Sequence, residues 1–225
     1  MSENLLRIAI DGPGGAGKST VAKRLAAEYH LDYVDTGAMY RAMGYKMKQA
    51  GVAAEEGEAL DALLAGTAID FSEGRILLDG EDVSGLIRTQ EISMAASACS
   101  ALGAVRRKLV AIQKEMGRSK SVVMDGRDIC TNVMPEAEFK FFITASPEER
   151  ARRRYLELIG KGQEADFDRI LEEINQRDYN DSHRELDPLR CAEDALLVDT
   201  TAMDVDQVIA YLRGIIDTAI ANGTR

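Results

Sequence analysis

The stretch GPGGAGKS, residues 12–19, lies between a short apolar run and a segment with helical spacing. The run LLRIAID (5–11) is typical of a buried strand. The segment KSTVAKRLAAEYH (18–30) repeats its apolar residues along one helix face. The stretch therefore predicts a tight strand-to-helix connection, and it matches the pattern G-x-x-x-x-G-K-[ST] in the context that this pattern requires.

The glycines of this loop allow backbone conformations that turn N–H groups inward around an anion, and the helix start adds partial positive charge. Lys18 offers a charge to the β- and γ-phosphates of a nucleotide, and Ser19 offers a hydroxyl to Mg²⁺. A glycine-rich turn that only joins strand and helix is the alternative. We expect the loop to bind ATP through Gly12, Pro13, Gly14, Gly15, Ala16, Gly17, Lys18, Ser19 and Thr20.

The rest of the chain alternates apolar runs with helical segments, which predicts an α/β protein with a mainly parallel sheet. Further strands are expected at 31–35, 121–126, 138–145 and 195–200, and further helices at 37–51, 55–66, 89–117, 146–162, 166–183 and 204–221. The helix at 89–117 is expected to break near Gly103. Residues 67–83 instead read as β-type runs broken by turn signals, which indicates a small antiparallel insertion.

The composition excludes several classes of protein. The 225 residues carry a net charge of -10, which argues against a protein that coats nucleic acid. No run of about 18 apolar residues exists to span a membrane, and MSENLLRIAI (1–10) lacks the features of a secretion signal. The three cysteines are widely spaced, which fits small core or surface residues in a reducing cytoplasm. EERARRRY (148–155) is locally basic, which suggests a small polyanion held at one place.

Charged residues gather where predicted strands end. VVMDGRD (122–128) resembles a Walker B strand, in which Asp125 would orient Mg²⁺ through water. Asp35, Arg127 and Asp128 also follow strands, and ligands of open α/β sheets gather at the carboxyl ends of strands. A strand-terminal aspartate can also serve only as a turn former or helix cap. The guanine-specifying pattern N-K-x-D is absent, which argues against a GTPase.

Several stretches in this order resemble the bacterial cytidylate kinases: IDGPGGAGKST, DTGAMYR, GEDVSGLIRTQEISMAAS, MDGRDICTNVMPEAEFKFFITASPEERARRR and RDYNDSHR. The resemblance runs from residue 7 to about 215. It implies Mg²⁺-dependent transfer of the γ-phosphoryl group of ATP to CMP or dCMP, giving CDP or dCDP and ADP. It also implies the nucleoside monophosphate kinase fold: one domain (1–225) with a five-stranded parallel sheet flanked by helices, a small antiparallel insertion (67–90) and a helical lid (148–165).

The resemblance further implies an acceptor site. Matched by position, its residues are Thr36, Tyr40, Arg41, Ser97, Arg106, Arg127, Asp128, Arg177, Asp181 and Arg184. Arg41 and Arg106 are expected to hold the CMP phosphate. Ser97 and Asp128 are expected to read the cytosine amino edge with Arg127 beside them, because a carboxylate accepts from an amine that uracil lacks.

The run RDYNDSHR places three of these residues on one expected helix face. Asp181 is expected to bind the ribose, Arg177 the sugar or the adjoining phosphate region, and Arg184 the base-phosphate side. Read from the residues alone, Arg177 and Asp181 fit an ordinary i,i+4 pair on an exposed helix better than a binding site. Arg106 is likewise compatible with a solvated helix face, and Tyr40 with a core position.

Catalysis is expected to depend on charge neutralisation, because the transferred phosphoryl group passes through a loose transition state. The residues expected to supply that charge are Lys18, Arg127, Arg150, Arg153 and Arg154, with Mg²⁺ at Ser19 and Asp125. The four arginines within residues 150–154 cannot all point one way. Two positions depart from the family pattern, since Gly14 and Thr36 stand where many relatives have Ser. The affinity for the acceptor and the order of preference among CMP, dCMP and UMP therefore stay open.

Two other functions remain open at this stage. Another small-molecule kinase with the same loop, such as a shikimate kinase, is one, although the chain lacks a Gly-Gly-Gly acceptor loop and is longer than that fold needs. A nucleotide-dependent switch without fast turnover is the other. We expect a cytoplasmic monomer that acts on the small nucleotides CMP, dCMP and ATP and binds neither nucleic acid nor a membrane.

Overall fold

The computed structural model describes residues 5–72 and 74–223. The first four residues, on which the argument against a secretion signal partly rests, lie outside this range, as does Glu73 in the turn of the predicted insertion. Contacts between Cα atoms divide the chain into two compact units: unit 1 comprises residues 1–31 and 121–225, and unit 2 comprises residues 32–120. Unit 1 is therefore built from both ends of the chain.

The sheet has five strands in the order β2-β6-β1-β7-β8, which confirms the predicted α/β class. Unit 1 supplies β1 (Arg7–Asp11), β6 (Val122–Gly126), β7 (Phe139–Thr144) and β8 (Leu196–Asp199). β1 pairs in parallel with both β6 and β7, and β7 pairs in parallel with β8. This position explains why the middle of β1, residues 8–10, is apolar without a break, because a central parallel strand is covered on both faces.

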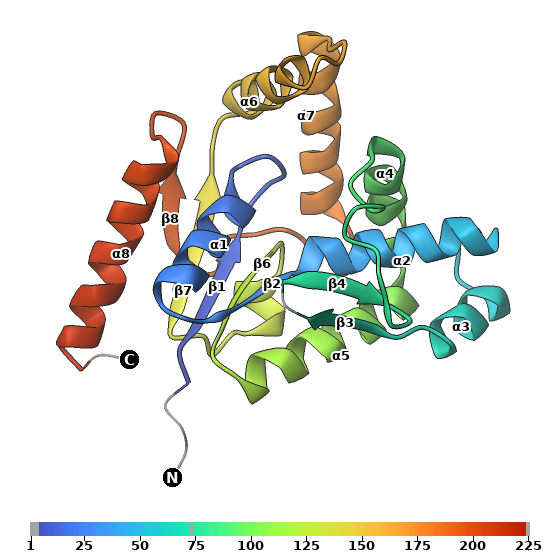
Figure 1. Ribbon diagram of the computed structural model, residues 1–225, viewed down its shortest axis with the longest axis horizontal. Coiled ribbons are helices and arrows are strands. Elements are labelled where there is room, and N and C mark those ends of the chain that lie inside the picture. The colour runs from blue at the N-terminus through green and yellow to red at the C-terminus, as the bar shows by residue number, and fades with distance from the viewer. Residues whose placement is uncertain (1–4, 73, 224–225) are drawn as a thin grey trace. The chain divides into compact units, whose positions relative to one another are not determined.

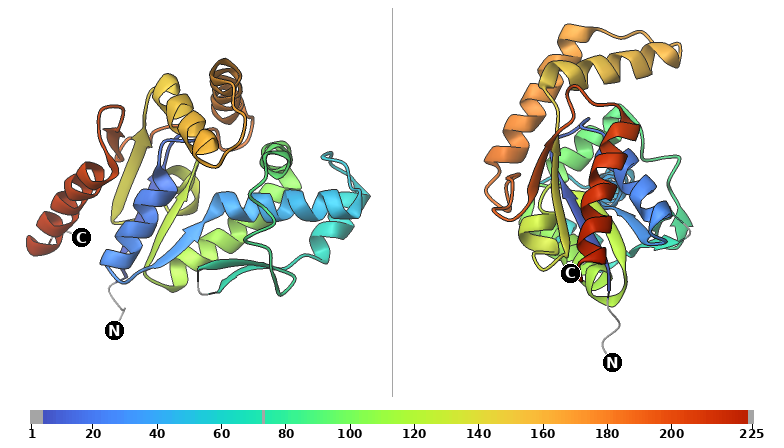
Figure 2. Two further views of the ribbon diagram at one scale, coloured as in Figure 1. Left: turned by 45° about the horizontal axis from the view of Figure 1, so that its top comes forward. Right: turned by 90° about the vertical axis from the view of Figure 1, so that its left-hand side faces the viewer.

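The helices of unit 1 are α1 (Lys18–Glu28), α6 (Pro147–Gly160), α7 (Phe167–His183) and α8 (Val205–Ala221). Helices α1 and α8 lie side by side against the sheet (Figures 1 and 2). Helix α6 begins as expected, with Pro147 in the first turn and the Ser146 side chain accepting from the Glu149 amide at 3.1 Å. A π-helix at Ile129–Val133 follows β6, in a segment for which the sequence predicted no element.

Unit 2 holds β2 (Asp32–Asp35), α2 (Thr36–Ala50), α3 (Glu58–Ala65), α4 (Gln90–Cys99) and α5 (Gly103–Ser119). The predicted break near Gly103 is confirmed, since α5 begins there. The predicted antiparallel insertion is a three-stranded sheet of β3 (Ile69–Ser72), β4 (Arg75–Leu78) and β5 (Glu81–Asp82). Its apolar face joins a core formed with α2, α3 and α5.

The cysteines lie in the core or at the surface, as expected. Cys99 and Cys130 are buried, Cys191 is exposed, and all three are free thiols. Across the described part of the chain, no helix is both long enough and apolar enough to cross a membrane.

Candidate active site

The loop of residues 12–19 begins where β1 ends and finishes in the first turn of α1. Gly12, Gly15 and Gly17 have positive φ values of 145°, 78° and 88°, which side chains rarely adopt. A Cβ added at Gly12 would lie 1.9 Å from the Ile143 carbonyl oxygen of β7, so the loop starts in direct contact with the neighbouring strand. The predicted strand, loop and helix are therefore present, and the residues named for phosphate binding surround the helix start.

Lys18 is the most perturbed cation of the loop. Its side chain is buried, and its Nζ donates to the Pro13 carbonyl at 2.7 Å. Burial, followed by repulsion from Arg127, lowers the pKa of Lys18 to about 7. Added negative charge next to the Lys18 ammonium group would therefore favour its protonated form further.

Ser19 and Asp125 meet at the carboxyl end of β6. The Ser19 hydroxyl donates to Asp125 Oδ2 at 3.0 Å, and the Asp125 side chain is buried. Two hard oxygen donors side by side suit Mg²⁺, which usually takes few protein ligands and keeps waters and phosphate oxygens. In residues 5–72 and 74–223, no group of three or more His, Cys, Asp or Glu is arranged to hold a metal.

Asp11 is a site residue that the sequence reasoning missed. Its fully buried carboxylate accepts from the backbone amides of Ile129 at 2.9 Å and Cys130 at 2.7 Å. Burial raises the pKa of Asp11 to about 6, although both amides oppose this shift. Asp11 thereby fixes the start of the π-helix that follows Arg127 and Asp128. The available signal was its place at the carboxyl end of a strand, directly before Gly12.

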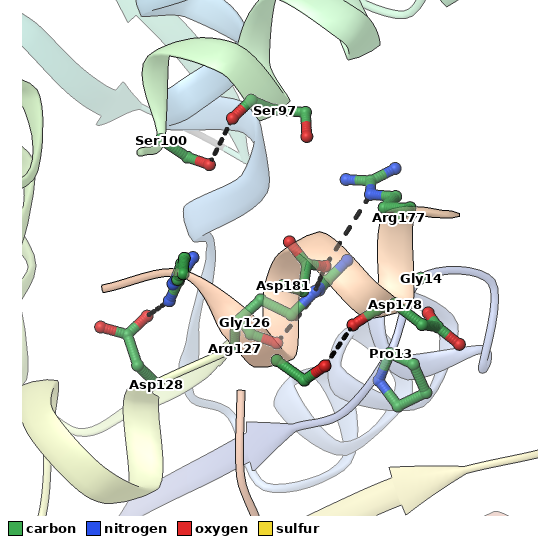
Figure 3. Close-up of polar contacts among 12 residues, drawn as sticks. Pro13, Gly14, Ser97, Ser100, Gly126, Arg127, Asp128, Arg177, Asp178 and Asp181 are labelled. Atoms are coloured by element: carbon green, nitrogen blue, oxygen red, sulfur yellow. Dashed lines mark hydrogen bonds and ion pairs between the residues drawn. The ribbon is translucent and has the colours of Figure 1, made fainter. Parts of the chain in front are cut away.

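Arg127 and Asp181 form the central ion pair of unit 1. Arg127 Nε donates to Asp181 Oδ2 at 2.8 Å, whereas Arg177 Nε lies 3.9 Å from the same oxygen (Figure 3). Burial favours the neutral form of Asp181, but Arg127, Arg177 and Arg184 outweigh this effect and lower its pKa. The interpretation of Arg177 and Asp181 as a merely exposed pair is therefore wrong, because Asp181 is buried and its nearer partner is on another element.

A second ion pair joins the end of α7 to the turn after β6. Arg184 Nη2 lies 3.3 Å from Asp128 Oδ1, and both side chains are largely buried. Arg184 caps α7 rather than lying within it, and its Nε donates to the Asp187 carbonyl at 2.8 Å. Arg177, Asp181 and Arg184 thus surround the turn that carries Arg127 and Asp128, as expected of one site.

The side chains of the four arginines of α6 do not all point one way, as their spacing predicted. Arg153 donates to Glu149 at 2.9 Å and to the Thr200 carbonyl at 2.7 Å. Arg154 donates to Glu157 at 2.8 Å and is half exposed, and Arg152 also pairs with Glu149. Arg150 is buried and donates to backbone carbonyls and to Asp178. Of the three predicted lid arginines, Arg154 has the most freedom to reach a nucleotide.

Unit 2 carries the remaining predicted residues. Helix α2 begins at Thr36, which is buried, and its N-cap Asp35 accepts from the Ala38 amide at 2.9 Å. The same helix carries Tyr40 and Arg41, and α4 carries Ser97, whose carbonyl accepts from Ser100 at 2.8 Å.

Arg106 on α5 is 2% exposed and stacks on the Tyr40 ring, with its guanidinium carbon 5.9 Å from the ring centroid. Its burial excludes the solvated helix face that the sequence also allowed. A buried guanidinium held by an aromatic ring is suited to an anionic ligand.

The cytidylate kinase family model matches residues 8–218. The chain belongs to the cytidylate kinase family. A cytidylate kinase of Clostridium perfringens (strain ATCC 13124) is 48% identical over 205 residues, covering 91% of this chain and 94% of the relative. A cytidylate kinase of Caldicellulosiruptor saccharolyticus is 47% identical over 221 residues, covering 96% and 98% of the two chains. The predicted family and its enzyme class, nucleoside monophosphate kinase, are confirmed.

Solved structures of low sequence identity show a likeness of fold alone. A gluconokinase from Sinorhizobium meliloti 1021 has a TM-score of 0.50 at 13% identity, covering 96% of this chain and 94% of its own. An uncharacterized protein from Eubacterium ventriosum has a TM-score of 0.55 at 15% identity, covering 96% and 99%. These likenesses agree with the α/β class.

Proposed function

We propose that this cytidylate kinase family member transfers the γ-phosphoryl group of ATP to CMP or dCMP, with Mg²⁺, and releases ADP with CDP or dCDP. The observation that supports this most directly is the cluster in unit 1. There the loop lysine, the Ser19–Asp125 oxygen pair and the ion pairs of Asp128 and Asp181 lie at the carboxyl ends of adjacent strands. One edge of the sheet thus offers groups for a triphosphate and groups for a nucleoside.

The donor residues act through charge and position. The loop amides and Lys18 would hold the phosphate chain. A protonated Lys18 would also stabilise the negative charge that develops on the phosphate oxygens during transfer. Ser19 and Asp125 would hold Mg²⁺, which supplies charge neutralisation for the phosphate oxygens when bound. Arg153 and Arg154 would add cationic charge from α6. No general base is needed, because the attacking phosphate oxygen of CMP is already anionic.

The acceptor residues are assigned by position, and the burial of Arg106 and Asp128 supports two of these assignments. Arg41 and Arg106 would bind the CMP phosphate, and Tyr40 would hold the Arg106 guanidinium in place. Asp128, fixed by Arg184, would accept from the cytosine amine with Ser97 on the same edge.

The remaining acceptor contacts involve the sugar. Asp181 would bind the ribose, with Arg177 beside it. Arg127, which holds the Asp181 carboxylate at 2.8 Å, would orient it toward the sugar.

We also propose that the chain acts in the cytoplasm as a monomer and as one kinase domain, with residues 148–165 as its lid.

An acceptor panel tests the proposal. With ATP and Mg²⁺, coupled ADP release is measured with CMP, dCMP, UMP, AMP and shikimate in turn. We expect rapid release with CMP and dCMP and slower release with UMP. Release that depends on shikimate would indicate the rival small-molecule kinase, and ATP binding without any acceptor-stimulated release would indicate a nucleotide-dependent switch.

A further inference from the structure

Arg150 differs from the other arginines of α6 in how completely its side chain is engaged. Its Nε donates to the Ala145 carbonyl at 2.9 Å, and its Nη1 donates to the Gly14 carbonyl at 3.0 Å. Nη1 and Nη2 also donate to the two carboxylate oxygens of Asp178, at 3.1 and 2.5 Å. The side chain is 3% exposed. Four of the five N–H donors of a guanidinium are therefore occupied by the protein itself.

These bonds join α6 to α7, the next helix along the chain, and to the phosphate loop, which is 136 residues away in sequence. Gly14 belongs to the phosphate loop, Ala145 precedes α6, and Asp178 lies on α7. A bidentate arginine–carboxylate pair has a fixed, planar geometry, so it restricts both distance and orientation. We define the Arg150–Asp178 pair, with its bond to the Gly14 carbonyl, as the brace.

The other side of Gly14 faces α7 as well. A Cβ added at Gly14 would lie 3.5 Å from Arg177 Cδ and 3.5 Å from Arg127 Nη2. Gly14 is thus held through its carbonyl by Arg150, while Arg177 and Arg127 lie on the side where a Cβ would be. Because Asp178 directly follows Arg177, the brace sets how closely Arg177 and the next turn, with Asp181, approach the loop.

We propose that Arg150 and Asp178 are positioning residues: the brace fastens α7 to the phosphate loop, so that a nucleotide held in the loop and an acceptor held by Arg177 and Asp181 bind cooperatively. This assigns Arg150 a role through other residues in place of direct contact with the transferred phosphoryl group. It rests on the proposed acceptor role of α7. Binding cooperativity of this kind is a coupling between two sites that each ligand exerts on the other equally.

The decisive variant is Asp178→Asn. It keeps the side-chain shape and leaves the bonds of Arg150 to Gly14 and Ala145 in place, but it removes the charge and one acceptor. We expect ATP affinity, measured by calorimetry with a non-hydrolysable analogue, to stay within about 2-fold of the original protein. The KM for CMP should rise at least about 5-fold, and the analogue should enhance CMP binding at least about 5-fold less.

Two further variants separate positioning from general loss of structure. Asp178→Glu keeps the carboxylate and should retain most of the coupling, since Asp178 lines an open surface pocket and is not tightly enclosed. Glu173→Gln removes the partner of Arg169 (3.1 Å) on an exposed face of the same helix, and it should leave both affinities unchanged.

Two results for Asp178→Asn would show that the brace does not couple the two binding sites. Asp178→Asn with unchanged CMP kinetics and unchanged coupling would overturn the proposal, as would an equal loss of ATP and CMP affinity. If the original protein turns over no CMP at all, the proposed function fails first, and the acceptor panel detects this separately.

Discussion

At the scale of single residues, Lys18 links the loop to pH. Because burial and Arg127 lower the pKa of Lys18 to about 7, the nucleotide-free protein loses this proton as pH rises through that value. Bound phosphates favour the charged form, so nucleotide binding at about pH 8 takes up a proton, whereas at about pH 6 the proton is already present. Calorimetry in buffers of different ionisation enthalpy should show uptake that approaches about one proton per nucleotide at the higher pH. Equal uptake by Lys18→Met would contradict this.

The same residue carries a kinetic prediction. Lys18→Ala should lower kcat about 10²-fold or more, because it removes a cation that favours charge developing in the transition state. Steady-state ADP release with saturating CMP is the measurement. Lys120→Ala, which removes the surface partner of Asp32, is the control and should leave kcat unchanged. Near-normal turnover of Lys18→Ala would remove Lys18 from the catalytic residues.

Asp128 carries the prediction on base recognition. Asp128→Asn replaces an acceptor for the cytosine amine by a group that can also donate. It should therefore lower kcat/KM for CMP about 10-fold or more and reduce the ratio of kcat/KM for CMP to kcat/KM for UMP. Asp199→Asn at the exposed end of β8 is the matched control. A variant that loses CMP and UMP activity in equal proportion would show that Asp128 holds structure and does not read the base.

At the scale of elements, two helical glycines should respond to Ala in opposite directions. A Cβ at Gly44 of α2 would lie 2.9 Å from the Ala96 amide nitrogen of α4, so Gly44→Ala should separate two packed helices and lower the Tm. A Cβ at Gly214 of α8 meets nothing within 4 Å, so Gly214→Ala should stabilise the protein by about 0.5–1 kcal/mol. Thermal unfolding of both variants is the measurement, and a shift of the same sign in both would contradict the packing.

At the scale of the whole molecule, the chain order couples the two compact units. Unit 2 is inserted within unit 1, so its unfolding would leave a flexible loop of about 90 residues inside unit 1. Closing such a loop costs about 4 kcal/mol, which should make the units unfold together. ATP analogue at 100 times its Kd adds about 2.7 kcal/mol, so a single calorimetric transition should move up by roughly 5–11 °C. Two transitions, of which only one moves, would show independent units.

Local patterns in the sequence predicted most of the fold but not every residue of the site. The loop at 12–19, the alternation of strands and helices, the break at Gly103 and the antiparallel insertion all follow from local patterns, and the structure confirms them. The π-helix at Ile129–Val133 and the role of Asp11 were missed. They depend on each other, because the two amides that open the π-helix donate to a carboxylate more than 100 residues away in sequence.

The amino-acid sequence by itself determined the strand–loop–helix phosphate site and the family, because each is recognised from short continuous stretches of sequence. Only the tertiary structure decided the direction of each arginine. Sequence spacing showed that residues 150–154 diverge, but not that Arg150 is buried against Gly14 and Asp178, or that Arg127 is nearer than Arg177 to Asp181. The physical reason is that a buried guanidinium lies where carboxylates and carbonyls from other elements satisfy its donors, and folding alone brings those partners together.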